Sequence, residues 1–492
     1  MHRIIMAAIL TAMAAALVGC EPTTEPTTEA ALAPTSADFS QVDASELQTQ
    51  SNGFVIVGAG NGLPRNLESQ VRAAGGVLTG TVPEINIAFA SSDDPGFGDR
   101  LKGVQFVGPD VLSEAPQAES FPAADAVSPA ATVDGIGDDE PYYPLLWGLQ
   151  AVRAPQAWDA NVLGDGVVVA VLDEGFGLGH GDVPFLAGQA ESFACWGVVV
   201  IGGITYVDQA PPPYCESPEY GAGYTPPGYF TLGPITDVFS HGTHVSGTIA
   251  GLDNGFGVIG VAPGAEILPV KVLSEYLGGG YTSWIIQGII YAANQGADVI
   301  NMSLGGTATI GGPGTSDVMR ASIVAYRRAI NYAKQMGVTV VVSAGNGYLD
   351  ADGDGKSWIR PAEFETPVTV SATAPYGIAY DPSADLDELA HYSNTGKSLV
   401  DFAAPGGDFD HPGGLYYFDM VLSTGAQGGY YWSAGTSMAS PHVAGIAALI
   451  IGESGGDMSP AQVEAELRKR AVDLGKPGND DAYGKGRVSS GY

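Results

Sequence analysis

Runs of consecutive non-polar residues alternate with helical patterns from about Pro141 to the end of the chain. A continuous apolar run of strand length is expected where both faces of a strand are buried, as in a parallel sheet covered by helices. Repeated strand–helix units therefore predict an α/β fold with a doubly wound parallel sheet, whose ligands bind at the carboxyl ends of the strands. The predicted strands are Gly166–Leu172, Ile267–Val272, Val299–Ser303 and Val338–Ser343, and the predicted helices are Ser283–Gln295, Val318–Gln335 and Met438–Ile451.

A second pattern, over residues 52–112, predicts a small α+β domain in front of this larger domain of residues 141–492. Residues 21–51 and 113–140 are rich in Ala, Pro, Thr, Ser and acidic residues, which predicts a flexible tether and an exposed linker that is open to cleavage. The small domain is predicted to contain strands Phe54–Val57, Val77–Val82, Ile85–Ala90 and Val104–Val107, and helices Arg65–Ala74 and Asp94–Leu101.

The first 20 residues form a targeting segment. His2 and Arg3 precede the apolar stretch Ile4–Val18, which is too short for an ordinary membrane span. The stretch leads into Gly19-Cys20 and resembles a bacterial lipoprotein signal, in which Cys20 would be diacylated and would become the mature N-terminus. The alternative is a simple secretory signal with an incidental cysteine. Either interpretation predicts export, as a membrane-anchored envelope protein or, after processing, as an extracellular one.

Composition narrows the possible partners. Asp and Glu outnumber Lys and Arg by 54 to 20, a formal net charge of −34, which makes a nucleic-acid partner improbable. The hydrophobic fraction of 45% is ample for a packed core. Three cysteines are too few for a disulfide scaffold or a four-cysteine zinc site.

Four polar residues stand at or beside predicted strand ends and helix starts. Asp173 follows the first strand, His241 begins a helix rich in small residues, and Ser437 stands at the start of another helix. A serine hydroxyl becomes a nucleophile when an imidazole takes its proton, and that imidazole needs a carboxylate to orient it. Asn346, after the strand Val338–Ser343, is placed to donate a hydrogen bond to a developing oxyanion.

The chain resembles the subtilisin-like serine proteases, the subtilases. The resemblance covers roughly residues 141–490, and residues 52–112 resemble the family's inhibitory propeptide. The stretches that carry it are Val171-Leu-Asp-Glu-Gly175, His241-Gly-Thr-His-Val-Ser-Gly247, Asn301-Met-Ser-Leu-Gly-Gly306, Ala344-Gly-Asn346 and Gly435-Thr-Ser-Met-Ala-Ser-Pro441.

The resemblance implies an exported endopeptidase, made as a zymogen, that hydrolyses peptide bonds through an acyl-enzyme. Its partners would be protein or peptide substrates, its own propeptide and, through the lipid, a membrane, and it would act as a monomer without an organic cofactor. By the resemblance Ser437 is the nucleophile, His241 the general base, Asp173 the orienting carboxylate and Asn346 the oxyanion donor. Substrate backbone would pair with Ser303, Leu304 and Gly305 on one side and with Gly279, Gly280 and Tyr281 on the other.

Two features depart from the family pattern. Glu174 follows Asp173 where family members carry Ser or Thr, and strand alternation predicts that its side chain points away from the triad. Residues Ala190–Gly233 form an insertion that contains Cys195 and Cys215. An exported protein permits a disulfide between them, and two buried free thiols are the alternative.

Structural calcium is the expected cofactor. The segment Leu252–Val258 resembles the family's calcium loop, with Asn254 offering a side-chain oxygen, Leu252, Phe256 and Val258 their carbonyls, and Asp182 a carboxylate. The family's further ligand near the mature N-terminus has no clear match around Tyr142–Tyr143. A second candidate is the acidic turn containing Asp350, Asp352 and Asp354, which resembles the start of an EF-hand loop.

One other function remains open. A catalytically silent binding protein on the same scaffold is the main alternative, although such relatives usually lack a triad or oxyanion residue. A zinc site at His241 and His244 lacks a third ligand and a general base, so His244 and His442 are interpreted as packing residues. Gly347 after Asn346 offers no charge to the substrate, which weakly favours cleavage after apolar or uncharged residues.

Overall fold

The computed structural model describes residues 49–492 apart from 115–118, 124–135, 138, 197, 202–203, 208–213, 221–238, 276, 310–314 and 354–356. The predicted signal with Cys20 and most of the tether lie outside the described residues. Within the part that is described, no helix combines the length and the apolar character needed to cross a membrane.

The core of the larger domain is an eight-stranded sheet with the order β19-β18-β16-β14-β6-β12-β7, and β20 pairs with β18. Every pairing in it is parallel except that of β18 with the short β19. The predicted doubly wound α/β fold is therefore confirmed. The strands are β6 (Val168–Asp173), β7 (Glu191–Ser192), β12 (Glu266–Lys271), β14 (Val299–Met302), β16 (Thr339–Ser343), β18 (Val368–Ala374), β19 (Glu388–Leu389) and β20 (Phe402–Pro405).

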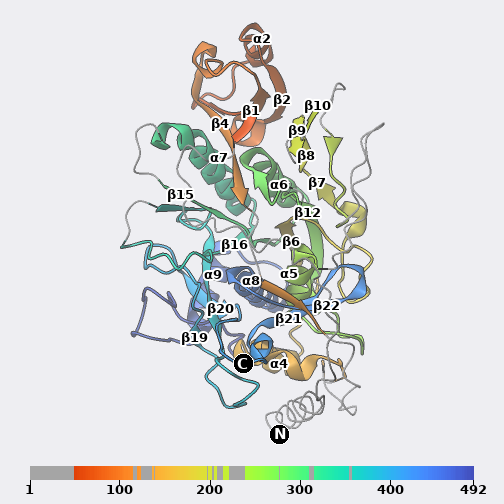
Figure 1. The fold of residues 1–492 in the computed structure, drawn as a ribbon. Helices are drawn as coiled ribbons and strands as arrows, with labels where there is room; N and C mark the ends of the chain where they lie inside the picture. Colours follow the sequence, from red (N-terminus) through yellow and green to blue (C-terminus); the bar gives the residue numbers. More distant parts are fainter. Residues whose placement is uncertain are drawn as a thin grey trace, which may run out of the picture.

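Alternate residues of each strand point to opposite faces of the sheet. Both faces carry apolar side chains, and helices cover both. Val169 and Val171 of β6 pack in one apolar cluster with helices α5 and α8, whereas Ala170 and Leu172 pack in another with α6 and α7. Helix α8 runs through the centre of the domain (Figure 1). The helices are α3 (Trp147–Ala151), α4 (Ala154–Asp159), α5 (His241–Ala250), α6 (Thr282–Asn294), α7 (Thr315–Gln335), α8 (Thr436–Glu453) and α9 (Pro460–Arg470), with single 3₁₀ turns at Tyr143–Leu145, Ala187–Gln189, Tyr416–Asp419 and Ala426–Gly428.

The N-terminal unit lies against helices α6 and α7 (Figure 1). It has a small core of its own, in which Phe97 is fully buried and packs on Phe54. The predicted second helix is a single 3₁₀ turn, Gly98–Arg100, because Gly96 and Gly98 disfavour a longer helix. Its other elements are β1 (Thr49–Gly58), α2 (Leu67–Ala73), β2 (Val77–Val82), a 3₁₀ turn (Pro83–Ile85), β3 (Ile87–Ser91) and β4 (Val104–Glu114), in the sheet order β13-β4-β1-β3-β2.

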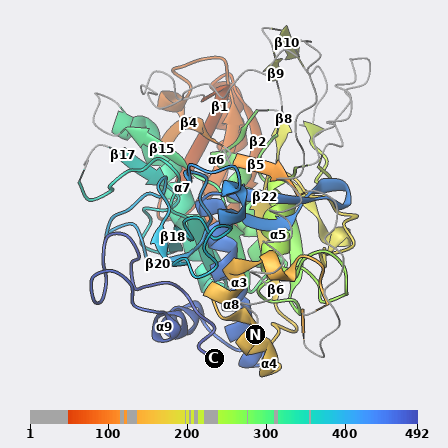
Figure 2. The ribbon, with the colours of Figure 1, turned by 60° about the horizontal axis from the view of Figure 1, so that its bottom comes forward.

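The segment 113–140 is not the fully exposed linker that its composition predicts. Strand β4 continues to Glu114 and pairs antiparallel with β13 (Gly279–Tyr281) of the larger domain. A further strand, β5 (Glu119–Pro122), pairs with β22 (Tyr430–Ala434), which in turn pairs with β21 (Val421–Thr424) (Figure 2). Strand pairing satisfies the backbone groups of a segment whose side chains build no core of their own.

The predicted insertion contains short antiparallel pairs. Strand β8 (Cys195–Trp196) pairs with β11 (Tyr214–Cys215), and β9 (Val198–Ile201) pairs with β10 (Ile204–Val207). A last pair joins β15 (Gly306–Thr309) to β17 (Ser357–Arg360), next to the cis peptide bond before Pro361.

Candidate active site

Asp173 and His241 meet at the carboxyl end of the sheet. Asp173 is the last residue of β6, and His241 is the first residue of α5. The helix begins there because the Ser240 hydroxyl accepts a hydrogen bond from the Thr243 amide, which is typical of an N-cap residue. Nδ1 of His241 lies 2.9 Å from both carboxylate oxygens of Asp173, and both side chains are buried. This contact fixes the tautomer that leaves Nε2 as a proton acceptor.

Ser437 lies in the first turn of α8, close to the same strand ends. Its hydroxyl donates to the carbonyl oxygen of Ser303 (3.4 Å), and Nε2 of His241 is buried without a hydrogen-bond partner. In the structure the serine hydroxyl is therefore hydrogen-bonded to Ser303 and not to the imidazole. A hydroxyl group changes its partner by rotation about one side-chain bond, so the arrangement allows the serine-to-histidine contact that catalysis needs.

The amide of Asn346 is oriented by the start of α8. Its oxygen accepts hydrogen bonds from the amide (2.9 Å) and the hydroxyl (2.7 Å) of Thr436, the residue before the serine. With the oxygen held in this way, the Nδ2 group is left to donate elsewhere. The first amides of a helix have no partner within the helix, so the backbone N–H of Ser437 is a second donor in the same place. Such a pair of donors suits a developing oxyanion.

The imidazole of His241 lies in a negative environment. Burial alone would lower its pKa, but the charge and hydrogen bond of Asp173 and the charge of Glu174 outweigh burial and raise the pKa above 6.5. Contrary to the prediction from strand alternation, Glu174 does not point away from the triad, because it lies just past the end of β6. Its carboxylate accepts a hydrogen bond from the backbone amide of His241 (3.3 Å), and burial raises its own pKa.

The two segments expected to hold substrate differ in what contacts them. Gly279, Gly280 and Tyr281 pair antiparallel with Glu114, Ser113 and Leu112, so the tail of the N-terminal unit lies along this edge. A Cβ atom on Gly280 would come within 2.1 Å of the Val272 carbonyl oxygen, so the edge requires glycine there.

On the other side, Ser303 and Leu304 are fully buried and Gly305 is partly exposed. The Ser303 hydroxyl donates to the carbonyl of Ser437 (2.8 Å) and contacts Ser440. Ser303 therefore holds the start of α8 at Ser437. The strand β4 of the N-terminal unit pairs with β1 and with β13.

The predicted calcium loop folds around Asp182. One carboxylate oxygen accepts from the Val258 amide (2.9 Å) and the Tyr430 hydroxyl (3.1 Å), and the other accepts from the Asn254 side chain (3.2 Å). The Leu252 amide donates to the Asp182 carbonyl. Phe256 has an exposed ring near Tyr430. The loop residues predicted from the sequence therefore lie together.

Glu140 is a member of this loop cluster that the sequence analysis missed. One of its carboxylate oxygens accepts from the amides of Asn254 (2.5 Å) and Gly255 (2.8 Å), and the other is buried without a hydrogen-bond partner. Asp139, Glu140 and Asp253 offer carboxylate oxygens within 4.8 Å of one another. An unpartnered buried carboxylate oxygen beside carbonyl-rich backbone fits a hard cation such as calcium. The acidic pair just before Tyr142 was the available signal.

The acidic turn at Asp350 is different. Asp354 lies outside the described residues. Asp352 accepts from the Lys397 amide (2.7 Å) and the Ser398 hydroxyl (2.5 Å), and Asp350 accepts from the Asp352 amide. The hydrogen bond from Ser398 lowers the pKa of Asp352. These carboxylates hold a neighbouring loop, and among the described residues they join no cluster of three ligands.

Cys195 is disulfide-bonded, and the residue opposite it in the pairing of β8 with β11 is Cys215. This arrangement agrees with the bonded alternative rather than with free thiols.

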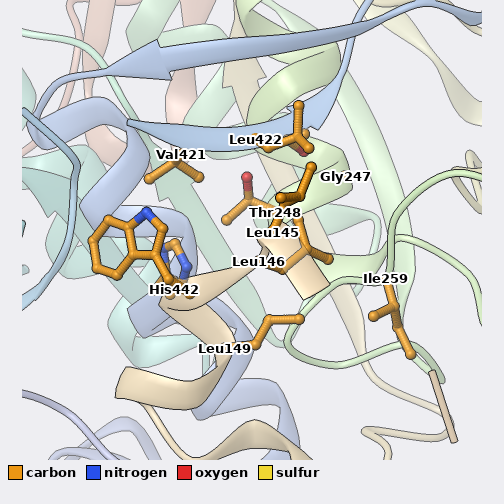
Figure 3. Close-up of a pocket in the computed structure, with 12 residues that line it drawn as sticks. Leu145, Leu146, Leu149, Gly247, Thr248, Ile259, Val421, Leu422 and His442 are labelled. Atoms are coloured by element: carbon orange, nitrogen blue, oxygen red, sulfur yellow. The ribbon is translucent and has the colours of Figure 1, made fainter. Parts of the chain in front are cut away.

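His244 and His442 are buried beside the motif helices. Burial lowers the pKa of His244 to about 3 and that of His442 to about 4, so both are neutral. His244 contacts the carbonyls of Val421 and Tyr431, and His442 lines a small apolar pocket with Leu145 and Leu149 (Figure 3). The described residues hold no cluster of three possible ligands around either ring, as expected for packing residues.

Comparisons with known proteins agree with this site. The sequence profile of the Subtilase family matches residues 164–486. The chain is 34% identical over 331 residues to the major intracellular serine protease of Bacillus subtilis, which covers 66% of this chain and 82% of that protein. It is 30% identical over 369 residues to the minor extracellular protease Epr of Bacillus subtilis, covering 75% of this chain but only 44% of that protein.

The fold is similar to that of the epidermin leader peptide processing serine protease of Staphylococcus aureus. The TM-score is 0.66 over 89% of this chain and 97% of that chain, at 21% sequence identity. At this identity the likeness concerns the fold alone.

Proposed function

This chain belongs to the subtilase family, the subtilisin-like serine endopeptidases, and from this premise we propose that it is an exported endopeptidase made as an inactive precursor. The observation that carries the proposal is the buried Asp173–His241 pair at the end of the sheet, with Ser437 and the oriented amide of Asn346 beside it. Each residue type that acyl transfer needs is present in this one place.

In the proposed reaction the Ser437 oxygen attacks the carbonyl carbon of a peptide bond while His241 takes the hydroxyl proton. Asp173 stabilises the imidazolium, and the Asn346 Nδ2 group with the Ser437 amide stabilises the oxyanion. The imidazolium then gives its proton to the leaving amine, and an acyl-enzyme forms on Ser437. Water, activated by the same imidazole, releases the acid product and restores the serine. A general base and oxyanion donors at these positions support this sequence of steps.

The N-terminal unit is proposed to be the inhibitory propeptide. Its last strand, β4, lies along β13, the edge that the resemblance assigns to substrate. The guanidinium of Arg328 on α7 donates to the carbonyls of Ile85 (3.1 Å), Asn86 (3.2 Å) and Gly58 (3.0 Å) of this unit. Charge-assisted hydrogen bonds of this kind favour a domain that stays docked while β4 blocks the edge.

Maturation is proposed to cut between the last residue of β4, Glu114, and the first residue of β5, Glu119. Strand β4 pairs on one side with β13, and β5 pairs with β22, which ends at Ala434, three residues before the nucleophile. The first pairing lies on the proposed substrate edge and the second on a strand that leads into the helix of Ser437, which supports a cut in the connection between them. The sequence alone left this boundary anywhere in the linker.

A structural calcium ion is proposed in the loop Leu252–Val258. Asp182, Glu140 and Asn254 would supply side-chain oxygens, and the carbonyls of the loop would supply the rest. Calcium would bring a double positive charge to these buried carboxylates. It would also hold the segment before Tyr142 to the loop. The acidic turn at Asp350 is a weaker candidate, because its described carboxylates join no group of three possible ligands and include no buried oxygen without a partner, unlike Glu140.

Export, the lipid anchor on Cys20, monomeric action and pairing of Cys195 with Cys215 complete the proposal. One relative is named as an extracellular protease, which supports export, and the Gly19-Cys20 sequence supports lipidation. The register of β8 with β11 supports the disulfide.

The decisive experiment is covalent labelling with an organophosphonate serine-hydrolase probe, followed by mapping of the labelled peptide. We expect label on Ser437 together with hydrolysis of a diverse peptide library, and neither in Ser437→Ala. A folded wild-type protein that takes no label and cleaves no peptide after removal of residues 49–114 would favour the silent binding protein instead.

A further inference from the structure

A buried lysine lies beside the proposed catalytic aspartate. Lys271 is the last residue of β12, and in the parallel pairing of β12 with β6 it lies opposite Asp173. Its side chain is fully buried, with 0% exposed. Burying an ammonium group is costly unless opposite charges and hydrogen-bond acceptors surround it. Lys271 therefore lies at the same end of the sheet as Asp173.

Three acceptors surround the Lys271 ammonium group. It donates to the carbonyl oxygen of Glu174, and it forms ion pairs with Glu275 and with Glu216, the latter at 2.9 Å. Both carboxylates are themselves buried, with 4% of the Glu216 side chain and 6% of the Glu275 side chain exposed. Burial would lower the pKa of Lys271, but these two charges outweigh burial and raise it, so the lysine is charged. The contacts with Glu174 and Glu275 are hydrogen bonds, and the contact with Glu216 is an ion pair.

Glu174 connects this cluster to the triad. Its carbonyl is held by Lys271, its amide donates to a carboxylate oxygen of Asp173 (2.8 Å), and its carboxylate accepts from the His241 amide (3.3 Å). The lysine therefore holds Glu174, which is hydrogen-bonded both to the carboxylate of Asp173 and to the backbone of His241, the proposed base. If Lys271 is removed, the turn after β6 loses its only charged anchor among these contacts, and the carboxylate that orients the imidazole loses its fixed position.

The counter-ion comes from the insertion. Glu216 directly follows Cys215, in the strand pair that contains the disulfide-bonded Cys195. The Glu216 carboxylate also accepts from the Ser274 hydroxyl (2.5 Å), and Ser274 exchanges backbone hydrogen bonds with Gly279 at the start of β13. The cluster therefore joins the insertion, the end of β6 and the substrate edge.

Resting on the proposed protease function, we propose that Lys271 is a positioning residue, which orients Asp173 and His241 by holding Glu174, and that Glu216 keeps Lys271 in place. Lys271 touches no substrate in this role. Its removal therefore lowers the rate of the chemical step and leaves substrate affinity largely unchanged.

The test compares Lys271→Met, Glu216→Gln and the double variant with the wild-type chain. An immobilised elastase, which cuts in the alanine-rich linker, matures each chain, so that self-processing is not required. The matched control is Lys485→Met, which removes a lysine that is ion-paired with Asp401 (2.5 Å) away from the triad. Readouts are kcat and KM on one peptide and the melting temperature.

We expect kcat of Lys271→Met to fall about 10- to 100-fold, with KM changed less than about 2-fold, because small misplacements of catalytic groups have effects of this size. Lys485→Met keeps the wild-type kcat. Lys271→Met should also have a lower melting temperature, because it leaves two buried carboxylates without a counter-charge. Adding Glu216→Gln restores much of the melting temperature while kcat stays low.

Recovery of kcat together with the melting temperature in the double variant would show a merely structural lysine and would overturn the inference. Wild-type kcat in Lys271→Met would do the same. If neither Lys271→Met nor the double variant folds, the Glu216→Gln variant decides. We expect its kcat to fall about 3- to 10-fold at unchanged KM. A wild-type kcat in Glu216→Gln overturns the inference. A wild-type chain that hydrolyses nothing overturns the proposed function instead.

Discussion

The carboxylate of Asp110, in strand β4 of the N-terminal unit, accepts a hydrogen bond from the backbone amide of Ser283 in the first turn of α6 (3.0 Å). The carboxylate is buried at the contact between the two domains, and a negative group at a helix N-terminus is favourable. Burial nevertheless dominates and raises the pKa of Asp110 to about 6. Docking of the N-terminal unit is therefore linked to pH.

We predict that docking weakens as the pH rises. The pKa of Asp110 is higher in the docked state, so its contribution is fully present below pH about 4, where the carboxyl group is protonated in both states, and is lost as the pH rises to about 6. A difference of about two pKa units corresponds to about 100-fold in the docking equilibrium at most. Urea titration of the Ser437→Ala precursor, followed by hydrogen exchange of β1 and β3, measures the effect. Asp110→Asn should flatten the dependence, and an unchanged slope in that variant would show that another group is responsible.

Arg328→Ala should loosen the docking of the N-terminal unit, the proposed propeptide. The guanidinium donates to three carbonyls and to the Gln105 side chain (3.0 Å), and hydrogen bonds to a charged donor contribute about 1.5–3 kcal/mol each, without being additive. We expect a loss of about 2–4 kcal/mol in docking. Arg327→Ala, which changes an exposed arginine on the same helix, is the control. Hydrogen exchange of the β1 amides measures the effect. Equal exchange rates in Arg328→Ala and Arg327→Ala would show that Arg328 does not anchor the N-terminal unit.

Activity should fall as the pH decreases through a value above 6.5. Neutral His241 is the proposed base, and Asp173 and Glu174 raise the pKa of its imidazole against the effect of burial. Glu174→Gln removes one of these charges, so the acid limb of kcat/KM should move to lower pH. Profiles from pH about 5 to 9 on the matured enzyme make the comparison. An acid limb that stays in place would mean that Glu174 is already neutral in the active enzyme.

Removal of calcium should destabilise the protein without touching the triad. An ion at 100 times its Kd stabilises by about 2.7 kcal/mol, so EDTA should lower the melting temperature of the Ser437→Ala precursor. Glu140→Gln should reduce the calcium-dependent part of the shift, whereas Asp352→Asn should leave it unchanged. Identical melting of wild type and Glu140→Gln across millimolar calcium would remove Glu140 from the site.

Cys20→Ser should abolish fatty-acid labelling and release the precursor from membranes. The thiol of Cys20 is the only acceptor that the lipoprotein-type signal offers. The Ser437→Ala background prevents self-cleavage from mimicking release. Labelled acid on the Cys20→Ser chain would point to a different anchor.

Hydrophobic patterning predicted the parallel sheet and its helices because buried strands and helices have distinct periods. The ends of α6 differ from the predicted Ser283–Gln295 by one residue each. Motif order likewise predicted Asp173, His241, Ser437 and Asn346, since each follows a recognisable strand or starts a helix. What the sequence could not give depends on contacts between distant segments.

Three such contacts matter here. Glu140 lies in a segment whose composition predicts a linker, and its partners are 114 and 115 residues away. Lys271 reads as one more residue of a strand until its counter-ion, 55 residues earlier in the chain, is placed beside it. Strand β5 has too few apolar residues to be predicted from the sequence. It is stabilised by its pairing with the edge of β22.

The two strand pairings on either side of the proposed cleavage point have a kinetic consequence. In the proposed maturation, the paired strands β4 and β5 belong to the same chain as Ser437, so cleavage between them would need no diffusional encounter. Reactions within one molecule proceed as if the reactant were present at an effective molarity far above any cellular concentration. Maturation should therefore be first order in precursor, with a half-life that does not change when the protein is diluted.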